Sequence, residues 1–330
     1  MPSQDFVADD TGDLFVTPPR TVFDLEAHLR GVAADKAGAA VAAFFAAGEP
    51  GADAYLLALA PADFRALIEA ALRQLSFTVG GARLRGHLID PDPGDAPTLM
   101  FLHDGLGCER LWRDVPHRLL AATGLSALLY DRQGCGDSDP LGDGSARRDY
   151  LCREALDVVP EILDDAGIRR AILVGHSDGG TIALAAAGAC PELVAGVIAE
   201  AAHLFREDKT LTEIRAQVKD FAEGDLRARL GRYHGAKAGP TFNRLAEIWL
   251  GEGARDWGID DLVARIRCPV LTLCGEDDEY FSSAQNNAIA EAVPGPVETV
   301  ELPRAAHVPH HQARKAALAA MAEFVKELAP

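Results

Sequence analysis

The sequence lacks the features that would mark a membrane or secreted protein. No apolar run is long enough to cross a bilayer, and the N-terminus has neither the basic start nor the apolar core of a secretory signal. Positive charge is scarce, because 32 lysines and arginines stand against 50 aspartates and glutamates, which gives a net charge of −18. So acidic a chain argues against nucleic acid or an anionic membrane as a partner. We expect a cytoplasmic protein.

Motifs for disulfides, metals and nucleotides are missing as well. The six cysteines are scattered and form no Cys-x-x-Cys pair, so we interpret them as buried or partly buried thiols. There is no His-Glu-x-x-His motif and no clustered cysteine–histidine set, so no metal is expected. The chain has no Gly-x-x-x-x-Gly-Lys-[Ser/Thr] loop, and Gly134-Cys135-Gly136 lacks the third glycine of a dinucleotide-binding turn. The sequence therefore predicts no cofactor.

What is present is an ordinary globular composition, with 48% hydrophobic and 25% charged residues in 330. That length suits one large α/β domain with insertions. The pattern of residues 1–75 indicates an N-terminal extension with two helices, at 21–47 and 61–75. Neither helix contains a recognisable catalytic or binding motif. Two short helices cannot bury their large apolar side chains between themselves. We therefore expect the extension to pack on the main domain, on the cap described next or on a second subunit. A homodimer would form through these N-terminal helices or through the cap.

From residue 76 onward, strands alternate with helices. This alternation predicts a doubly wound, mostly parallel α/β sheet, with its chemistry at the carboxyl ends of the strands. The alternation breaks between residues 203 and 267, where three helical patterns follow one another. We interpret 203–267 as a helical cap insertion, which divides the core into 76–202 and 268–330. The expected strands cover residues 77–79, 82–89, 98–102, 125–130, 171–174, 193–200, 269–274 and 297–302.

The stretch from Ala171 to Leu184 reads as a buried strand, a sharp turn and a buried helix. The turn is Gly175-His176-Ser177-Asp178-Gly179, a Gly-x-Ser-x-Gly motif. In a nucleophile elbow the serine takes a strained backbone conformation, and the glycines let the strand and the helix approach closely. The pentapeptide alone also fits an ordinary strand–helix connection, so the flanking chain must decide.

Four further motifs stand at predicted strand ends, in a fixed order along the chain. They are His103-Asp104-Gly105, Asp131-Arg132-Gln133-Gly134-Cys135-Gly136-Asp137-Ser138, Gly275-Glu276-Asp277-Asp278 and His307. Together with the elbow, they make the chain from about Phe77 to the C-terminus resemble the α/β-hydrolase superfamily. The resemblance implies the sheet of that fold and a capped member with a serine nucleophile. It does not extend to the first 75 residues.

The resemblance also implies a catalytic triad. Ser177 would be the nucleophile, His307 the general base and Asp278 the acid that orients the imidazole. A serine hydroxyl is a poor nucleophile until a base takes its proton, and the imidazole needs a carboxylate to fix its tautomer. The neighbouring alternatives are Asp277 for the acid, and His310 and His311 for the base.

The implied oxyanion hole uses the backbone N–H groups of Gly105 and Asp178. The family commonly has His-Gly-x where this chain has His103-Asp104-Gly105, so Leu106 is an alternative to Gly105. The Asp178 carboxylate is read as a helix-start group turned away from the substrate. His203, at the end of a strand near the cap, and Leu106 are candidate pocket residues.

The resemblance implies a serine hydrolase that cleaves a small ester, thioester or related acyl compound through an acyl-enzyme. A carbon–carbon bond hydrolase with the same three residues is an alternative. A second class is a non-catalytic ligand-binding or interaction protein on the same fold, which labelling by a fluorophosphonate probe would distinguish. Ser177 argues against haloalkane dehalogenases and most epoxide hydrolases of this fold, because those use an aspartate at the elbow.

Overall fold

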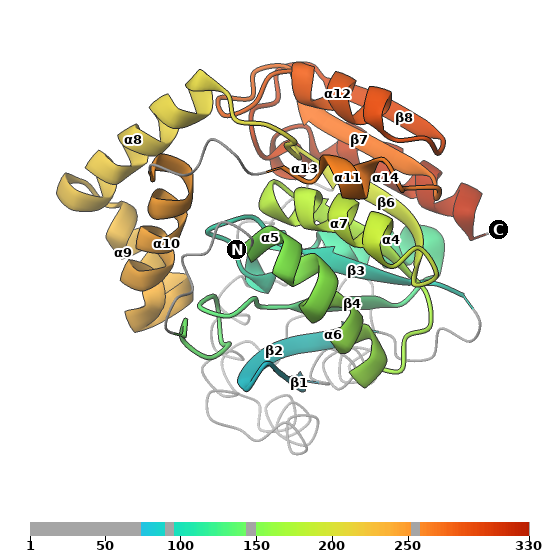
Figure 1. Ribbon diagram of the computed structural model, residues 1–330, viewed down its shortest axis with the longest axis horizontal. Helices are drawn as coiled ribbons and strands as arrows, with labels where there is room; N and C mark the ends of the chain where they lie inside the picture. Colours follow the sequence, from blue (N-terminus) through green and yellow to red (C-terminus); the bar gives the residue numbers. More distant parts are fainter. Residues whose placement is uncertain (1–73, 90–95, 143–149, 252–257, 330) are drawn as a thin grey trace, which may run out of the picture. The chain divides into compact units, whose positions relative to one another are not determined.

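The fold is built on an eight-stranded sheet, seen from the side in Figure 1. The computed structural model describes residues 74–89, 96–142, 150–251 and 258–329. The helix expected at 21–47, residues 61–73 of the helix expected at 61–75, and the packing of the extension lie outside the described residues. The prediction is wrong for the last two residues of the 61–75 helix, because Gln74 and Leu75 belong to a strand. The strands are β1 (Gln74–Val79), β2 (Ala82–Ile89), β3 (Thr98–Leu102), β4 (Ala127–Tyr130), β5 (Ala171–His176), β6 (Val194–Glu200), β7 (Val270–Gly275) and β8 (Val297–Leu302).

The strand order is β1-β2-β4-β3-β5-β6-β7-β8. β1 and β2 form an antiparallel hairpin, and its turn residues Gly80 and Gly81 have φ angles of 56° and 83°, which favour glycine. β2 is antiparallel to β4, while β3 to β8 pair in parallel. The expected doubly wound, mostly parallel sheet is therefore confirmed. β1 begins at Gln74, two residues before the expected start of the core at residue 76.

Helices cover both faces of the sheet, which explains why β3, β4, β5, β6 and β7 are buried along their whole length. One core lies under α5 (Tyr150–Arg153), η3 (Glu154–Val158), α6 (Val159–Asp165), α7 (Asp178–Ala189), α11 (Asp260–Val263) and α12 (Ala284–Ala292). A second core lies under η2 (Glu109–Trp112), α4 (Val115–Thr123) and α14 (Arg314–Leu328), with the short α13 (Pro309–Gln312) before α14.

Three helices that the sequence predicts as continuous are interrupted. The helix expected at 111–123 is a 3₁₀ turn followed by α4, with Arg113 at φ 52° between them. The helix expected at 310–328 is broken at Ala313 into α13 and α14. The helix expected at 147–166 contains the π-helical turn η3, which ends two residues before Pro160 of α6. A proline has no N–H to donate, so the regular hydrogen-bond pattern is interrupted near it.

Three helices follow β6 where the sequence predicts an insertion. They are α8 (Asp208–Glu223), α9 (Leu226–His234) and α10 (Ala238–Leu250), with a 3₁₀ turn η4 (Gly235–Lys237) before α10. They share a small core in which the rings of Phe221 and Phe242 stack at 4.1 Å. Figure 1 shows them together at one end of the sheet.

The chain after these helices returns to the sheet. Val263 of α11 and the following Ile266 are fully buried in the core that also contains α7. The last residues of the expected insertion therefore belong with the sheet. Among the described helices, none combines the length and the apolar character needed to span a membrane.

Candidate active site

Ser177 stands at a sharp turn between β5 and α7. Its backbone has φ 55° and ψ −118°, a strained conformation for a residue other than glycine. The turn is possible because its neighbours lack side chains: a Cβ on Gly175 would lie 2.1 Å from the carbonyl oxygen of Gly179, and a Cβ on Gly179 would lie 1.9 Å from that of Leu102. These close approaches are those of a nucleophile elbow.

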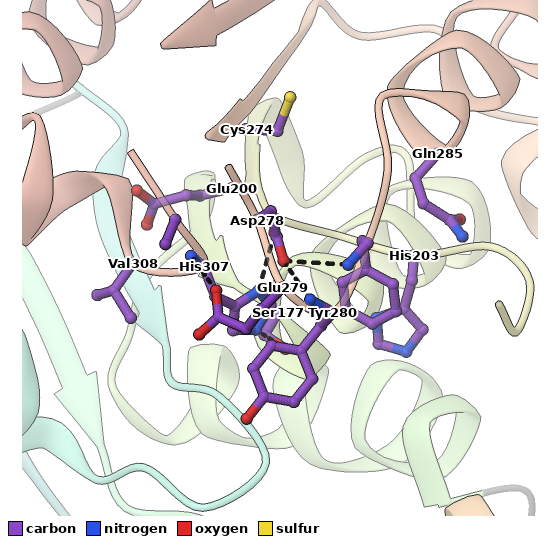
Figure 2. Close-up of polar contacts among 12 residues, drawn as sticks. Ser177, Glu200, His203, Cys274, Asp278, Glu279, Tyr280, Gln285, His307 and Val308 are labelled. Atoms are coloured by element: carbon purple, nitrogen blue, oxygen red, sulfur yellow. Dashed lines mark hydrogen bonds and ion pairs between the residues drawn. The ribbon is translucent and has the colours of Figure 1, made fainter. Parts of the chain in front are cut away.

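The three residues of the implied triad meet at this turn, although 130 positions separate Ser177 from His307. The Nε2 atom of His307 lies 3.1 Å from Ser177 Oγ, and its Nδ1 atom lies 2.9 Å from Asp278 Oδ2 (Figure 2). Ser177 follows β5, Asp278 follows β7 and His307 follows β8. The parallel strands thus deliver the three side chains to the same edge of the sheet.

The loop after β7 selects Asp278 rather than Asp277 as the partner of His307. Asp278 Oδ1 accepts the backbone N–H groups of Tyr280, at 2.7 Å, and Phe281, at 3.0 Å, which leaves Oδ2 for the imidazole. Burial alone would raise the pKa of Asp278, but the bond to His307 and these two donors lower it. Asp277 is exposed.

The other two histidines considered for the base have different partners. His310 Nδ1 lies 2.5 Å from Glu200 Oε2, and His311 donates from Nε2 to the carbonyl of Leu111 at 2.9 Å. Both belong to α13. Of the three histidines, His307 is the one whose ring bonds Ser177.

The loop after β3 turns tightly around Asp104. The N–H of Leu106 donates to Asp104 Oδ1 at 2.9 Å, so this alternative oxyanion donor is already engaged. Gly105 faces the elbow, since a Cβ added to it would lie 2.7 Å from Asp178 Oδ2 and 2.4 Å from Leu245 Cδ1. Gly105 therefore remains the candidate donor from this loop, beside the N–H of Asp178 at the start of α7.

Arg132 is a site residue whose role the sequence did not reveal. The residue is 1% exposed, and its guanidinium donates to the carbonyls of His103, at 3.0 Å, and Asp104. Its backbone N–H donates to His103 Nε2 at 3.0 Å. Burial and the charge of Arg132 lower the pKa of His103 well below its ordinary value, so this imidazole is a neutral acceptor. Arg132 thereby fixes the loop that carries Gly105; its place in the motif after β4 was the available signal.

His176 links the elbow to two other loops. Its Nε2 donates to the carbonyl of His307 at 2.7 Å, and its Nδ1 lies 3.8 Å from Asp104 Oδ2. Burial would lower the pKa of His176, but the carboxylates of Asp104 and Glu200 raise it to about 9. The imidazole is thus positively charged at neutral pH and holds the His307 loop and the Asp104 loop together.

The two candidate pocket residues lie in an apolar wall beside Ser177. Leu106 packs with Ile214, Leu245, Trp249 and Phe281. His203 is fully buried, stacks on the ring of Phe281 at 4.7 Å and has its Nε2 3.7 Å from Asp178 Oδ1. The ring of Phe281 also lies 5.6 Å from that of His307.

The helices that follow β6 are fastened to loops at the carboxyl ends of the strands. Lys209 of α8 donates to the carbonyl of Asp278 at 2.5 Å, and Thr210 donates to that of Tyr280 at 2.6 Å. Thr241 of α10 donates to the carbonyl of Gly134 at 2.6 Å, after β4. Within the described ranges, no three histidine, cysteine or acidic side chains are grouped so that they could hold a metal ion.

Comparison with known proteins gives a consistent family match. A family model described as "Alpha/beta hydrolase family" matches residues 99–321. The chain is 36% identical over 123 residues to a 2-hydroxy-6-oxononadienedioate/2-hydroxy-6-oxononatrienedioate hydrolase from Paraburkholderia phymatum, covering 36% of this chain and 40% of that one. It is 30% identical over 131 residues to a proline iminopeptidase from Saccharolobus solfataricus, covering 39% and 41%. The match thus spans about two fifths of the length of these relatives.

Solved structures show the same fold. A thermophilic esterase from Thermogutta terrifontis superposes with a TM-score of 0.60 and 18% sequence identity, covering 78% of this chain and 100% of the esterase. At this identity the likeness concerns the arrangement of strands and helices rather than the substrate.

Proposed function

The chain belongs to the alpha/beta hydrolase family, and we propose that it is a serine hydrolase that cleaves a small ester, thioester or related acyl compound. The observation that carries the proposal is the continuous row of hydrogen bonds from Asp278 through His307 to Ser177. Such a row activates a hydroxyl that is otherwise a weak nucleophile.

In the proposed reaction, His307 takes the proton of Ser177 while Oγ attacks the substrate carbonyl. Asp278 accepts the Nδ1–H of His307, which keeps Nε2 free to act as the base and stabilises the imidazolium that forms. The N–H groups of Gly105 and Asp178 donate to the developing oxyanion. His307 then protonates the leaving group, and a water molecule that it activates hydrolyses the acyl-enzyme.

The helices α8 to α10 are proposed as the cap of this site. Their bonds to the loops after β4 and β7 support this role, as does the contact of Leu245 with Gly105. A homodimer through these helices or through the N-terminal helices expected within residues 1–75 is a further proposal.

A carbon–carbon bond hydrolase is the second candidate. It is favoured by the relative whose name specifies a 2-hydroxy-6-oxo dicarboxylate as substrate. The same three residues would serve that reaction, so variants of these residues do not distinguish the two candidates. Assays with ester and carbon–carbon cleavage substrates do. The intact hydrogen-bonded row argues against a non-catalytic binding protein.

The proposal is tested by fluorophosphonate labelling and by a screen of acyl esters, thioesters and carbon–carbon cleavage substrates. Ser177→Ala is expected to abolish labelling and to lower kcat by several orders of magnitude, because the triad acts as a unit. Ser283→Ala, a change at an exposed serine of the loop before α12, is the matched control and should label like the wild type. Wild-type turnover in Ser177→Ala would refute the mechanism.

A further inference from the structure

The residue after Gly105 is held at both of its backbone groups. The N–H of Leu106 donates to Asp104 Oδ1 at 2.9 Å, and its carbonyl accepts the Nε2–H of His234 at 2.8 Å. Leu106 stands between Gly105 and Gly107, and a glycine backbone has more conformational freedom than that of any other residue. The direction of the Gly105 N–H, the candidate oxyanion donor, therefore depends on how firmly Leu106 is held.

His234 is the last residue of α9, in the proposed cap. It is 2% exposed, and its Nδ1 accepts the backbone N–H of Gly136 at 3.0 Å. Nδ1 therefore carries no proton, and Nε2 carries the one that is donated to Leu106. Burial and the cations Lys237 and Arg110 lower the pKa of His234, which keeps the ring neutral. One imidazole thus joins the loop after β4 to the loop after β3.

Gly136 is a fixed point for this imidazole. Its φ is 43°, and a Cβ there would lie 1.8 Å from Asp131 Oδ2, so a glycine is needed for the close packing of the loop. The carbonyl of Gly136 accepts Lys237 Nζ at 2.6 Å, and Asp131 Oδ2 accepts the N–H of Asp137 at 2.8 Å. The loop after β4 is thus held by several bonds of its own, and His234 extends that support to the loop of Gly105.

The second candidate donor has a different support. The N–H of Asp178 belongs to the first turn of α7, whose side chains form part of the core under the sheet. Asp178 is 2% exposed, and its Oδ2 accepts the hydroxyl of Tyr150 from α5. The same oxygen lies beside Gly105, so the carboxyl group does not turn away from the site as expected. The two halves of the oxyanion hole are therefore held by different parts of the fold.

We propose that His234 positions the oxyanion hole: by holding the Leu106 carbonyl, it directs the N–H of Gly105 toward the oxygen of the substrate carbonyl. This role rests on the proposed hydrolase function and adds one residue of the cap to it. A backbone carbonyl needs a donor, so without His234 that of Leu106 turns to another partner. The flanking glycines offer little resistance to such a turn. Because His234 acts through Leu106 and Gly105, it is a positioning residue.

Two amide variants separate the two bonds of the imidazole. His234→Gln places an amide nitrogen where Nε2 stands, so it keeps the donation to Leu106. His234→Asn places an amide oxygen where Nδ1 stands, so it keeps the bond to Gly136 but is too short to reach Leu106. Thr241→Val is the control, because it removes a different buried hydrogen bond from the cap to the loop after β4, at Gly134.

The readout is inhibition by two ketones, hexyl trifluoromethyl ketone and hexyl methyl ketone. Ser177 Oγ adds to the carbonyl carbon of the first, its proton passes to His307, and the carbonyl oxygen becomes an oxyanion in the hole. The methyl ketone binds without this addition. The ratio of the two inhibition constants therefore measures the oxyanion hole, and a loss of folded protein does not change it.

The wild type and His234→Gln should bind the trifluoromethyl ketone much more tightly than the methyl ketone. His234→Asn should weaken the trifluoromethyl ketone by about ten- to a hundredfold, the cost of misplacing a catalytic group, and leave the methyl ketone unchanged. With an ester substrate, kcat should fall by a similar factor while KM stays near the wild-type value, since the donor acts in the transition state. Thr241→Val should keep the wild-type ratio.

A merely structural role of His234 would lower the stability of both amide variants and leave the ratio of inhibition constants unchanged, which would overturn the inference. An equal change of the ratio in His234→Gln and His234→Asn, or the same change in Thr241→Val, would also overturn it, because the effect would not follow the Leu106 bond. Fluorophosphonate labelling of Ser177 in these cases leaves the proposed hydrolase function standing. A wild type without labelling and without turnover of any ester would instead refute the proposed function.

Discussion

His310 donates from Nδ1 to Glu200 across 2.5 Å and ties the turn after His307 to the end of β6. The backbone N–H of His310 donates to the other carboxylate oxygen at 2.7 Å, and the carbonyl of Glu200 accepts the N–H of Ser177 at 2.8 Å. Burial would raise the pKa of Glu200, but His310 lowers it, so the carboxylate is ionised. One buried glutamate thus holds both the elbow and the turn that carries His307.

Glu200→Gln is expected to lower kcat about tenfold or more, because small displacements of a catalytic group are costly. It should also reduce the free energy of unfolding at pH 7 by about 1–3 kcal/mol. The lowered pKa of Glu200 contributes stability above its ordinary value of 4.5, and this contribution is lost as pH falls through the folded-state pKa. Urea unfolding at several pH values should therefore show the variant approaching the wild type below pH 4.5.

The control for this change is Glu298→Gln, at an exposed position of β8. It should leave both kcat and the unfolding free energy close to those of the wild type. A Glu200→Gln protein with wild-type kcat would show that the contact does not position His307.

Asp278→Asn is expected to lower kcat/KM by about 10³- to 10⁴-fold, because an amide fails to hold His307 in the tautomer that leaves Nε2 free. Asp277→Asn changes an exposed neighbour and should keep most of the activity. Steady-state kinetics on the substrate found in the screen gives both values. Equal losses in the two variants would contradict the assignment of the acid.

Gly179→Ala should destabilise the protein by about 3 kcal/mol or more, because the new Cβ would lie 1.9 Å from the carbonyl oxygen of Leu102 and the backbone must move. Gly231→Ala is the matched change in the interior of α9, where nothing lies within 4 Å of the new Cβ. It should stabilise by about 0.5–1 kcal/mol, since alanine favours helix over glycine. Urea midpoints that move in the same direction for both variants would contradict this account of the elbow.

The raised pKa of His176 predicts that the folded protein loses stability at alkaline pH. Because the folded-state pKa is raised from 6.5 to about 9, the stabilisation is complete below pH 6.5 and is lost as pH rises through 9. The shift corresponds to about 3 kcal/mol. His176→Gln should lack this pH-dependent part of the unfolding free energy between pH 6 and 10, whereas His117→Gln, at an exposed site on α4, should retain it. A wild-type stability that is flat over this range would refute the assignment.

Local sequence pattern was sufficient for the parts of the fold that depend on near neighbours. The expected spans of β2 and β8 match the structure, since their apolar spacing and the glycines and prolines that flank them are local features of the sequence. The resemblance to the α/β-hydrolase superfamily implied Ser177, Asp278 and His307 as a triad, and in the structure the His307 ring lies within hydrogen-bond distance of the other two side chains. Their catalytic roles stay predictions.

Contacts between residues that are far apart in the sequence could not be predicted from local sequence patterns. The bond between Glu200 and His310 joins residues 110 positions apart, and no periodicity in either segment signals it. The Tyr150–Asp178 bond likewise depends on how α5 packs against α7. The break at Ala313 has no proline or glycine beside it that would have predicted it.

The π-helical turn Glu154–Val158 has a consequence for how the family can vary. Such a turn contains one residue more than a regular helical turn, and one residue corresponds to a rotation of about 100° around the helix axis. Removal of that residue would turn Tyr150 away from Asp178. Among homologues, we therefore expect chains that lack the extra residue of this turn to have an apolar side chain in place of Asp178. The extra residue and the carboxylate should then be found together or be absent together.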